Sequence, residues 1–240
     1  SLGIDGARRV VDLWAERWRR CEATGDMIIV RYADDFIVGF QHEADARRFL
    51  DMMRGRLQEF ALSLHPEKTR LIEFGRLAAE NRKRRGLGKP ETFTFLGFIF
   101  ICSKTRQGKF QIKRKTRRDR MRAKLQAIKQ ELRRRMHQPI PEQGKWLKQV
   151  VTGYFNYHAV PTNGPTLTAF LFHVTNLWRR ALRRRSQKDW TTWERAARLA
   201  RERREDAQRI AAGNAPMESG NNAVNASEYG VKPNGFAAAD

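Results

Sequence analysis

The sequence has few cysteines and no long apolar run. Cys21 and Cys102 are its two cysteines and lie far apart, which excludes a disulfide framework and the ligand spacing of a zinc site. No apolar run reaches the roughly 18 residues of a membrane-spanning helix, and the first residues do not resemble a signal peptide. We therefore expect a soluble, cytoplasmic protein with no membrane partner, in which both cysteines are buried as small apolar side chains.

Acidic residues are scarce relative to basic ones. The chain has 26 Asp and Glu against 48 Lys and Arg, which gives a formal net charge of +22. Such an excess indicates a polyanionic partner, and arginine is well suited to bidentate contacts with phosphate. Nucleic acid is the first expectation, and an anionic membrane surface is the alternative.

Two short apolar segments, residues 27–32 and 36–40, flank Ala33, Asp34 and Asp35. Their β-branched and aromatic residues predict a β-hairpin with both carboxylates at its tip. Adjacent carboxylates suit Mg²⁺, which prefers oxygen ligands, and a pair of such ions can catalyse phosphoryl transfer. The alternative is that these aspartates only favour the turn, since Asp is common in turns.

The segments around this hairpin predict a mixed architecture. Apolar residues at helical spacing indicate helices over 7–21, with Trp14 and Trp18 in the core, and over 43–60. Strands are expected over 69–74, 92–100 and 109–113, with an exposed basic loop over 75–91. We therefore predict an α+β fold with a sheet covered by helices on one side.

The C-terminal half reads as helical. Helical apolar stripes with short Pro- and Gly-containing links predict a bundle of three helices, the first up to about residue 136, then 142–158 and 165–185. The composition becomes strongly basic near Arg114, where we place a domain boundary. A charged helix is expected over 189–210 and a disordered tail over 211–240.

Several motifs occur in an order that resembles a known family. They are Tyr32-Ala33-Asp34-Asp35, then Leu64-His65-Pro66-Glu67-Lys68-Thr69, then Phe95-Leu96-Gly97-Phe98, and finally Gly153-Tyr154-Phe155-Asn156-Tyr157 followed by the basic segment around Trp178. Together they resemble the palm and thumb of group II intron-encoded reverse transcriptases, the reverse transcriptase/maturase family. His158 departs from the pattern, because relatives commonly have a second Tyr there.

The resemblance implies a role for each matching residue. Asp34 and Asp35 would be catalytic ligands of Mg²⁺, and Lys68 would lie near the triphosphate of the dNTP substrate. Phe95, Leu96 and Gly97 would form the primer grip. Residues 1–113 would be the C-terminal part of the palm and 114–188 the maturase or thumb domain, with intron RNA and an RNA/DNA template–primer as partners.

Basic residues near these motifs are the candidate RNA contacts. They are Arg82, Lys83, Arg84, Arg85, Lys113, Arg114, Lys115, Arg117, Arg118, Arg179, Arg180, Arg183, Arg184, Arg185 and Lys188. The alternative is that these charges are merely solvated, or that those at helix ends complement the helix dipole.

The resemblance also implies a missing part. In this family the fingers and the first half of the palm, with another metal-binding Asp, precede the segment that corresponds to residue 1. We therefore expect the 240-residue chain to be inactive alone and to need a separate N-terminal fragment. The alternatives are a non-catalytic RNA-binding module that assists splicing, or a decayed remnant.

Overall fold

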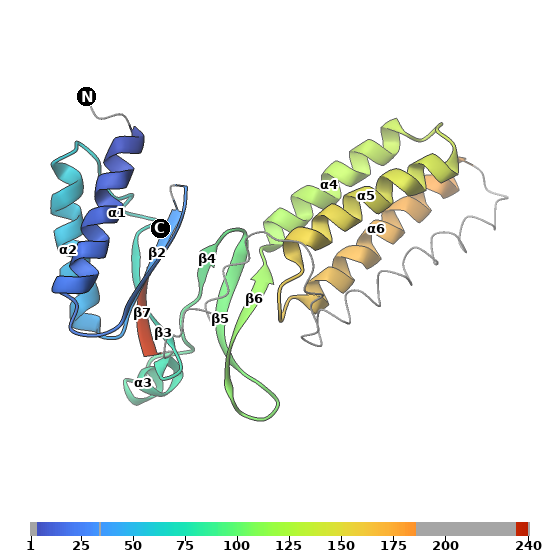
Figure 1. Cartoon of the computed structure of the whole chain (residues 1–240). Coiled ribbons are helices and arrows are strands. Elements are labelled where there is room, and N and C mark those ends of the chain that lie inside the picture. Colours follow the sequence, from blue (N-terminus) through green and yellow to red (C-terminus); the bar gives the residue numbers. More distant parts are fainter. Residues whose placement is uncertain (1–3, 34, 186–233, 240) are drawn as a thin grey trace. The chain divides into compact units, whose positions relative to one another are not determined.

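The computed structural model describes residues 4–33, 35–185 and 234–239 (Figure 1). The chain divides into two compact units. The first unit contains Ser1–Leu96, Phe100–Ile112 and Val224–Asp240, and the second contains Gly97–Ile99 and Lys113–Ala223. The fold is α+β, with small antiparallel sheets and a helical region, as the sequence predicts.

The main sheet of the first unit is built around the predicted hairpin. Its strands are β1 (Met27–Tyr32), β2 (Asp35–Phe40), β7 (Asn234–Ala239) and β3 (Arg70–Gly75), in the order β1-β2-β7-β3. All neighbouring strands are antiparallel, and Tyr32 pairs with Asp35 at the tip of the hairpin. The predicted hairpin is therefore present, with two residues in its turn.

Two helices pack on one face of this sheet (Figure 1). They are α1 (Ile4–Cys21) and α2 (Glu43–Gln58). The predicted core position of Trp18 is confirmed: it is 2% exposed and its ring contacts Phe40 and Phe49, at centroid distances of 5.9 and 5.1 Å. Edge-to-face aromatic contacts of this kind stabilise a core beyond the area that they bury. They fix both helices against the hairpin strands.

The last described residues correct one expectation. Residues 211–240 were expected to be a disordered tail, but Asn234–Ala239 form β7, which pairs with β2 on one side and β3 on the other. Composition favours disorder in this segment, whereas the main-chain groups of β2 and β3 favour a strand that can hydrogen-bond with both. Tertiary pairing therefore outweighs composition over these six residues.

A second sheet contains β4 (Phe93–Phe95), β5 (Phe98–Lys104) and β6 (Phe110–Thr116), in that order. The single strand expected over 92–100 is thus wrong. Leu96 and Gly97 have φ angles of 48° and 76°, so they form a left-handed turn that divides the segment into two strands.

Two smaller expectations are also corrected. The basic segment 75–91 is not entirely a loop, because Ala78–Arg84 form helix α3, where Ala78, Ala79 and Glu80 favour helix and the first glycine comes at position 86. Cys21 is exposed, and Cys102 is only partly buried and accepts a hydrogen bond from the Gly75 amide at 3.3 Å.

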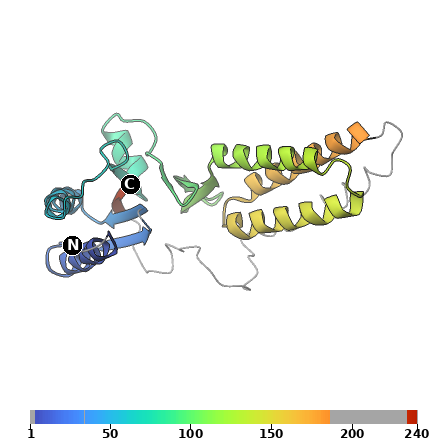
Figure 2. The same ribbon diagram turned by 90° about the horizontal axis from the view of Figure 1, so that it is seen from above.

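The described part of the second unit, up to Arg185, forms three helices side by side (Figures 1 and 2). They are α4 (Arg118–Arg134), α5 (Ile140–His158) and α6 (Gly164–Arg185). Their core is apolar and closely packed, with Leu147, Leu167 and Phe170 fully buried. The charged helix expected over 189–210 lies outside the described residues. Within the described ranges, no helix has the length and apolar character needed to cross a membrane.

Candidate functional site

The tip of the β1–β2 hairpin is the candidate catalytic site. Tyr32 pairs with Asp35, so the turn lies between these two residues and includes Ala33. Ala33 has a φ of 54°, an unusual backbone angle for a residue with a side chain, and such angles concentrate in tight turns and functional sites. Asp34 itself lies outside the described residues.

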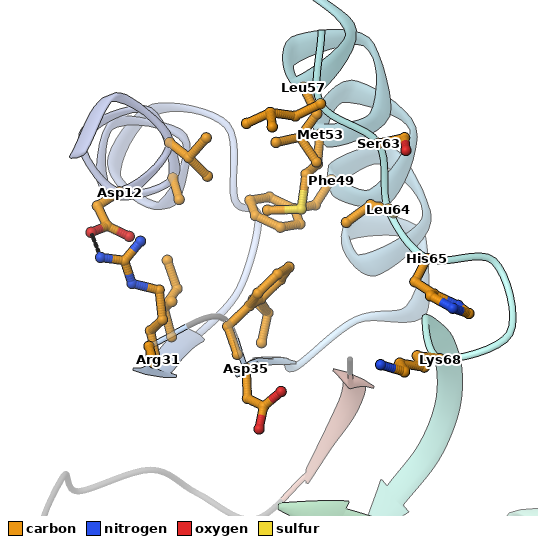
Figure 3. Close-up of a pocket in the computed structure, with 17 residues that line it drawn as sticks. Asp12, Arg31, Asp35, Phe49, Met53, Leu57, Ser63, Leu64, His65 and Lys68 are labelled. Atoms are coloured by element: carbon orange, nitrogen blue, oxygen red, sulfur yellow. Dashed lines mark ion pairs between the residues drawn. The ribbon is translucent and has the colours of Figure 1, made fainter. Parts of the chain in front are cut away.

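Asp35 is the predicted metal ligand that the structure describes. It begins β2 and is exposed, and Tyr32 beside it is 58% exposed. In Figure 3 the Asp35 carboxylate points away from the apolar side chains of α2. The carboxylate is therefore open to solvent, as a ligand for a substrate-bound cation must be.

A cavity of about 360 Å³ lies next to the tip. Figure 3 shows it between α1, α2, the hairpin strands and the segment leading into β3. Apolar side chains make up most of its wall: Val11, Ala15, Ile29, Ala33, Phe36, Val38, Phe49, Met53, Leu57, Leu62 and Leu64. Its polar lining comes from Asp12, Arg31, Asp35, Ser63, His65 and Lys68.

The structure brings Lys68 and Asp35 to this same cavity. Lys68 precedes β3 and is exposed, and in Figure 3 its ammonium group points toward the side of the cavity where Asp35 lies. Two residues 33 positions apart in sequence thus line one cavity, with opposite charges.

A neighbouring ion pair fixes the other side of the cavity. Arg31 Nη2 lies 2.6 Å from Asp12 Oδ2 and joins β1 to α1. Both side chains are partly exposed, so the pair adds at most about 1 kcal/mol to stability. Its main consequence is that the Asp12 carboxylate already has a cationic partner, which leaves Asp35 as the better candidate for a metal.

The proposed primer grip lies at a turn. Phe95 is buried, whereas Leu96 and Gly97 form the left-handed turn between β4 and β5. A Cβ on Gly97 would meet no atom within 4 Å, so the glycine is needed for its φ of 76°. The space over the turn would also allow close approach of another chain.

Some predicted RNA contacts are engaged within the protein. Arg82 and Arg85 form ion pairs with Glu91 and Glu73, and Arg117 lies 2.7 Å from Asp119. Arg114 is half-buried, and this burial lowers the pKa of its guanidinium group. These residues have less capacity for phosphate than their charge in the sequence indicates.

Other predicted contacts are exposed. They are Lys83, Arg84, Lys113, Lys115, Arg118, Arg180, Arg183, Arg184 and Arg185, whereas Arg179 is partly buried. Arg185 also donates a 2.6 Å hydrogen bond to the Gln138 carbonyl. Lys188 lies outside the described residues.

The sequence did not point to a buried polar network in the second unit. Asn163 donates to the Thr116 hydroxyl at 2.8 Å and to the His158 carbonyl at 2.9 Å, and its own carbonyl accepts from the Thr116 amide at 3.1 Å. Burial lowers the pKa of His158 to about 4, which keeps its ring neutral. Asn156 and Tyr157, at the end of the Gly153–Tyr157 motif, are exposed.

Comparison with known proteins bears on the first half of the chain. Residues 7–100 match a reverse transcriptase family model. That model is described as reverse transcriptase (RNA-dependent DNA polymerase), and the match spans less than half of the chain. No curated protein matches the chain.

The matched segment, residues 7–100, contains the candidate site. The hairpin, Lys68 and the turn at Leu96 and Gly97 all fall within it. The match supports reverse transcriptase activity at a general level, with a nucleic-acid template–primer and nucleotides as the general substrates.

The candidate site offers an oxygen ligand to a divalent cation. Asp35 provides an exposed oxygen ligand at the tip, and Mg²⁺ commonly takes one or two carboxylates and completes its coordination with water and substrate phosphates. Among the described side chains no group of three possible ligands occurs. Asp35 would therefore supply one ligand to a cation that completes its coordination with water and substrate phosphates.

Proposed function

We propose that the chain is the palm and thumb part of an RNA-directed DNA polymerase of the group II intron type. The observation that carries the proposal is the match of residues 7–100 to the reverse transcriptase model, with Tyr32-Ala33-Asp34-Asp35 at the tip of a hairpin. Asp34 and Asp35 would hold Mg²⁺. The chemistry that this ion supplies when bound is activation of the primer hydroxyl and neutralisation of the leaving group.

Lys68 would act on the leaving group. Pyrophosphate departs with developing negative charge, and an ammonium group beside it can stabilise that charge or donate a proton. Support for this role comes from the cavity that Lys68 shares with Asp35.

The helical unit would act as the thumb and maturase domain and bind intron RNA. Support comes from the predicted contacts that are exposed, Arg118 on α4 and Arg180, Arg183, Arg184 and Arg185 on α6. Contacts to phosphate need no active site, so this unit could hold intron RNA independently of polymerisation.

A second candidate function is an RNA-binding module that assists splicing without catalysis. The observation that favours it is the set of exposed cations on α4 and α6, in a chain of net charge +22. The two functions differ in whether DNA synthesis depends on the hairpin carboxylates.

Primer extension separates them. The assay uses an RNA template, a DNA primer, dNTPs and Mg²⁺. It is performed on three forms of the protein: the 240-residue chain, this chain together with a separately expressed N-terminal fingers and palm fragment, and the product of the longest reading frame that contains the chain. We expect synthesis in an active form to fall at least about 100-fold in Asp34→Ala and Asp35→Ala, since each removes a metal ligand.

Asp51→Ala is the matched control, because Asp51 is an exposed carboxylate of α2 paired with Arg54 at 3.1 Å. Synthesis that persists in Asp34→Ala would contradict the site assignment. RNA binding without synthesis in any of these forms would support the second function instead.

A further inference from the structure

A small groove between α4 and α6 has an unusual lining. Its volume is about 150 Å³, and it lies wholly within the second unit. Four cations line it, two from each helix: Lys129, Arg133, Arg180 and Arg184. Leu132, Met136, Leu177 and Ala181 supply its apolar lining.

Among the residues that the structure describes, no carboxylate lines the groove. Glu131 is the closest acidic residue in sequence, but it pairs with Arg134 and Arg135, at 3.7 and 2.8 Å. None of the four groove cations forms an ion pair with any side chain that the structure describes. The groove therefore concentrates positive charge without internal compensation.

This arrangement costs stability in the free protein. Lys129 and Arg133 are four residues apart on α4, and Arg180 and Arg184 are four apart on α6, and like charges at this spacing repel on a helix. The helix dipole favours cations only in the last turn, which includes Arg133 and Arg184. It does not account for Lys129 or Arg180, which lie further from the helix ends.

The groove is held in place by buried contacts. Leu132 is 2% exposed and belongs to the core of the unit. Gln143, at 1% exposure, donates to the carbonyls of Arg135 and Gln138 and accepts from Trp178 Nε1 at 3.2 Å. These hydrogen bonds connect the end of α4 to α6 and hold the two helices in position. Helices that are already in position lower the entropic cost of binding a ligand between them.

We propose that this groove, the α4–α6 groove, binds the phosphate backbone of an RNA strand. The proposal rests on the RNA-binding part of the proposed function and deepens it by adding Lys129 and Arg133 as contacts. Residues four apart on a helix are about 6 Å apart along its axis, so each helix presents two cations in a row to a backbone with regularly spaced charges. Contacts of this kind hold RNA without reading its sequence.

The test compares two variants of the full chain with equal net charge. The groove variant carries Lys129→Gln, Arg133→Gln, Arg180→Gln and Arg184→Gln. The control variant carries Arg120→Gln, Lys124→Gln, Lys145→Gln and Lys148→Gln, which are exposed cations of the same unit that do not line the groove. Affinity for a short oligouridine is measured against salt concentration, and circular dichroism checks the fold of each variant.

Each phosphate contact contributes about 0.7 to the slope of log affinity against log salt for a single strand. We expect the slope of the groove variant to fall by about 3, and that of the control variant by less than about 1. If wild-type protein binds RNA and both variants lose the same slope, only net charge matters and the groove is not a site. If wild-type protein does not bind RNA at low salt, the RNA-binding part of the proposed function fails together with the groove.

Discussion

The buried network around Asn163 gives a quantitative prediction for Asn163→Ala. Asn163 is fully buried and makes three hydrogen bonds of 2.8–3.1 Å, two with Thr116 and one with the His158 carbonyl. It joins the end of β6 to the link between α5 and α6. Alanine at this position would remove all three bonds.

The size of the destabilisation depends on which hydrogen bonds Thr116 and His158 retain in Asn163→Ala. The His158 carbonyl still accepts from the Val160 amide at 2.9 Å, so it is not left without a donor. The Thr116 amide loses its acceptor in a residue that is 3% exposed, and an unsatisfied buried group costs about 1–3 kcal/mol. With the other two bonds at about 0.5–1.5 kcal/mol each, we expect a loss of about 2–6 kcal/mol in the free energy of unfolding of this unit.

Native-state hydrogen exchange of peptides from α5 and α6 measures this loss in the full chain, because it reports the opening free energy of one region. Asn156→Ala is the control, since Asn156 is an exposed asparagine on α5 and its loss should change stability by less than about 0.5 kcal/mol. If Asn163→Ala matched this control, the network would not stabilise the unit and the reasoning would be refuted.

Three further predictions test other parts of the structure. Burial lowers the pKa of His158 from about 6.5 to about 4, so the unfolded state binds the proton more tightly than the folded state. Acidification from pH 6.5 to pH 4 should therefore lower the free energy of unfolding by on the order of 3 kcal/mol. Urea unfolding measures this loss, which should be absent from His158→Phe. Gly97→Ala should cost about 1 kcal/mol because of its φ of 76°, whereas Gly55→Ala on α2 should add about 0.8 kcal/mol, both measured by thermal unfolding. In a background without native cysteines, Leu71→Cys and Ala238→Cys should form a disulfide under oxidation, because these residues are partners in the β3–β7 ladder. A cysteine pair displaced by one residue should not form a disulfide.

The hairpin could be predicted because its signal is local. Apolar segments on either side of Ala33-Asp34-Asp35 predict two strands and a short turn, although the structure begins β2 at Asp35, which pairs with Tyr32. The three helices of the second unit were predictable for the same reason, since apolar stripes at helical spacing persist over 17–22 residues.

Elements that depend on distant partners were missed. β7 forms because β2 and β3 both offer main-chain groups to it, and nothing in Asn234–Ala239 alone indicates a strand. The turn at Leu96 was missed because a leucine with positive φ has no signature in the sequence, although Gly97 beside it is a weak signal. Pairing with strands that are distant in sequence determines β7.

The candidate RNA interface was predictable in sign but not in detail. The sequence shows which residues are cationic, whereas only the fold shows that Arg82 and Arg85 are paired with glutamates. Lys129 and Arg133 were not singled out, because their relation to α6 depends on the packing of helices far apart in sequence. Their spacing of four residues on α4 was the available signal.

The most direct test of the central claim is whether the hairpin tip binds a divalent cation. Mn²⁺ replaces Mg²⁺ at such sites and broadens the NMR signals of nearby amides, so it reports binding even without DNA synthesis. We expect the amide signals of Tyr32, Ala33 and Asp35 to broaden in wild type and in Asp51→Ala, and to stay sharp when Asp34 and Asp35 are both replaced by Ala. Equal broadening in the double variant, or no broadening in wild type, would contradict the assignment of these carboxylates as metal ligands.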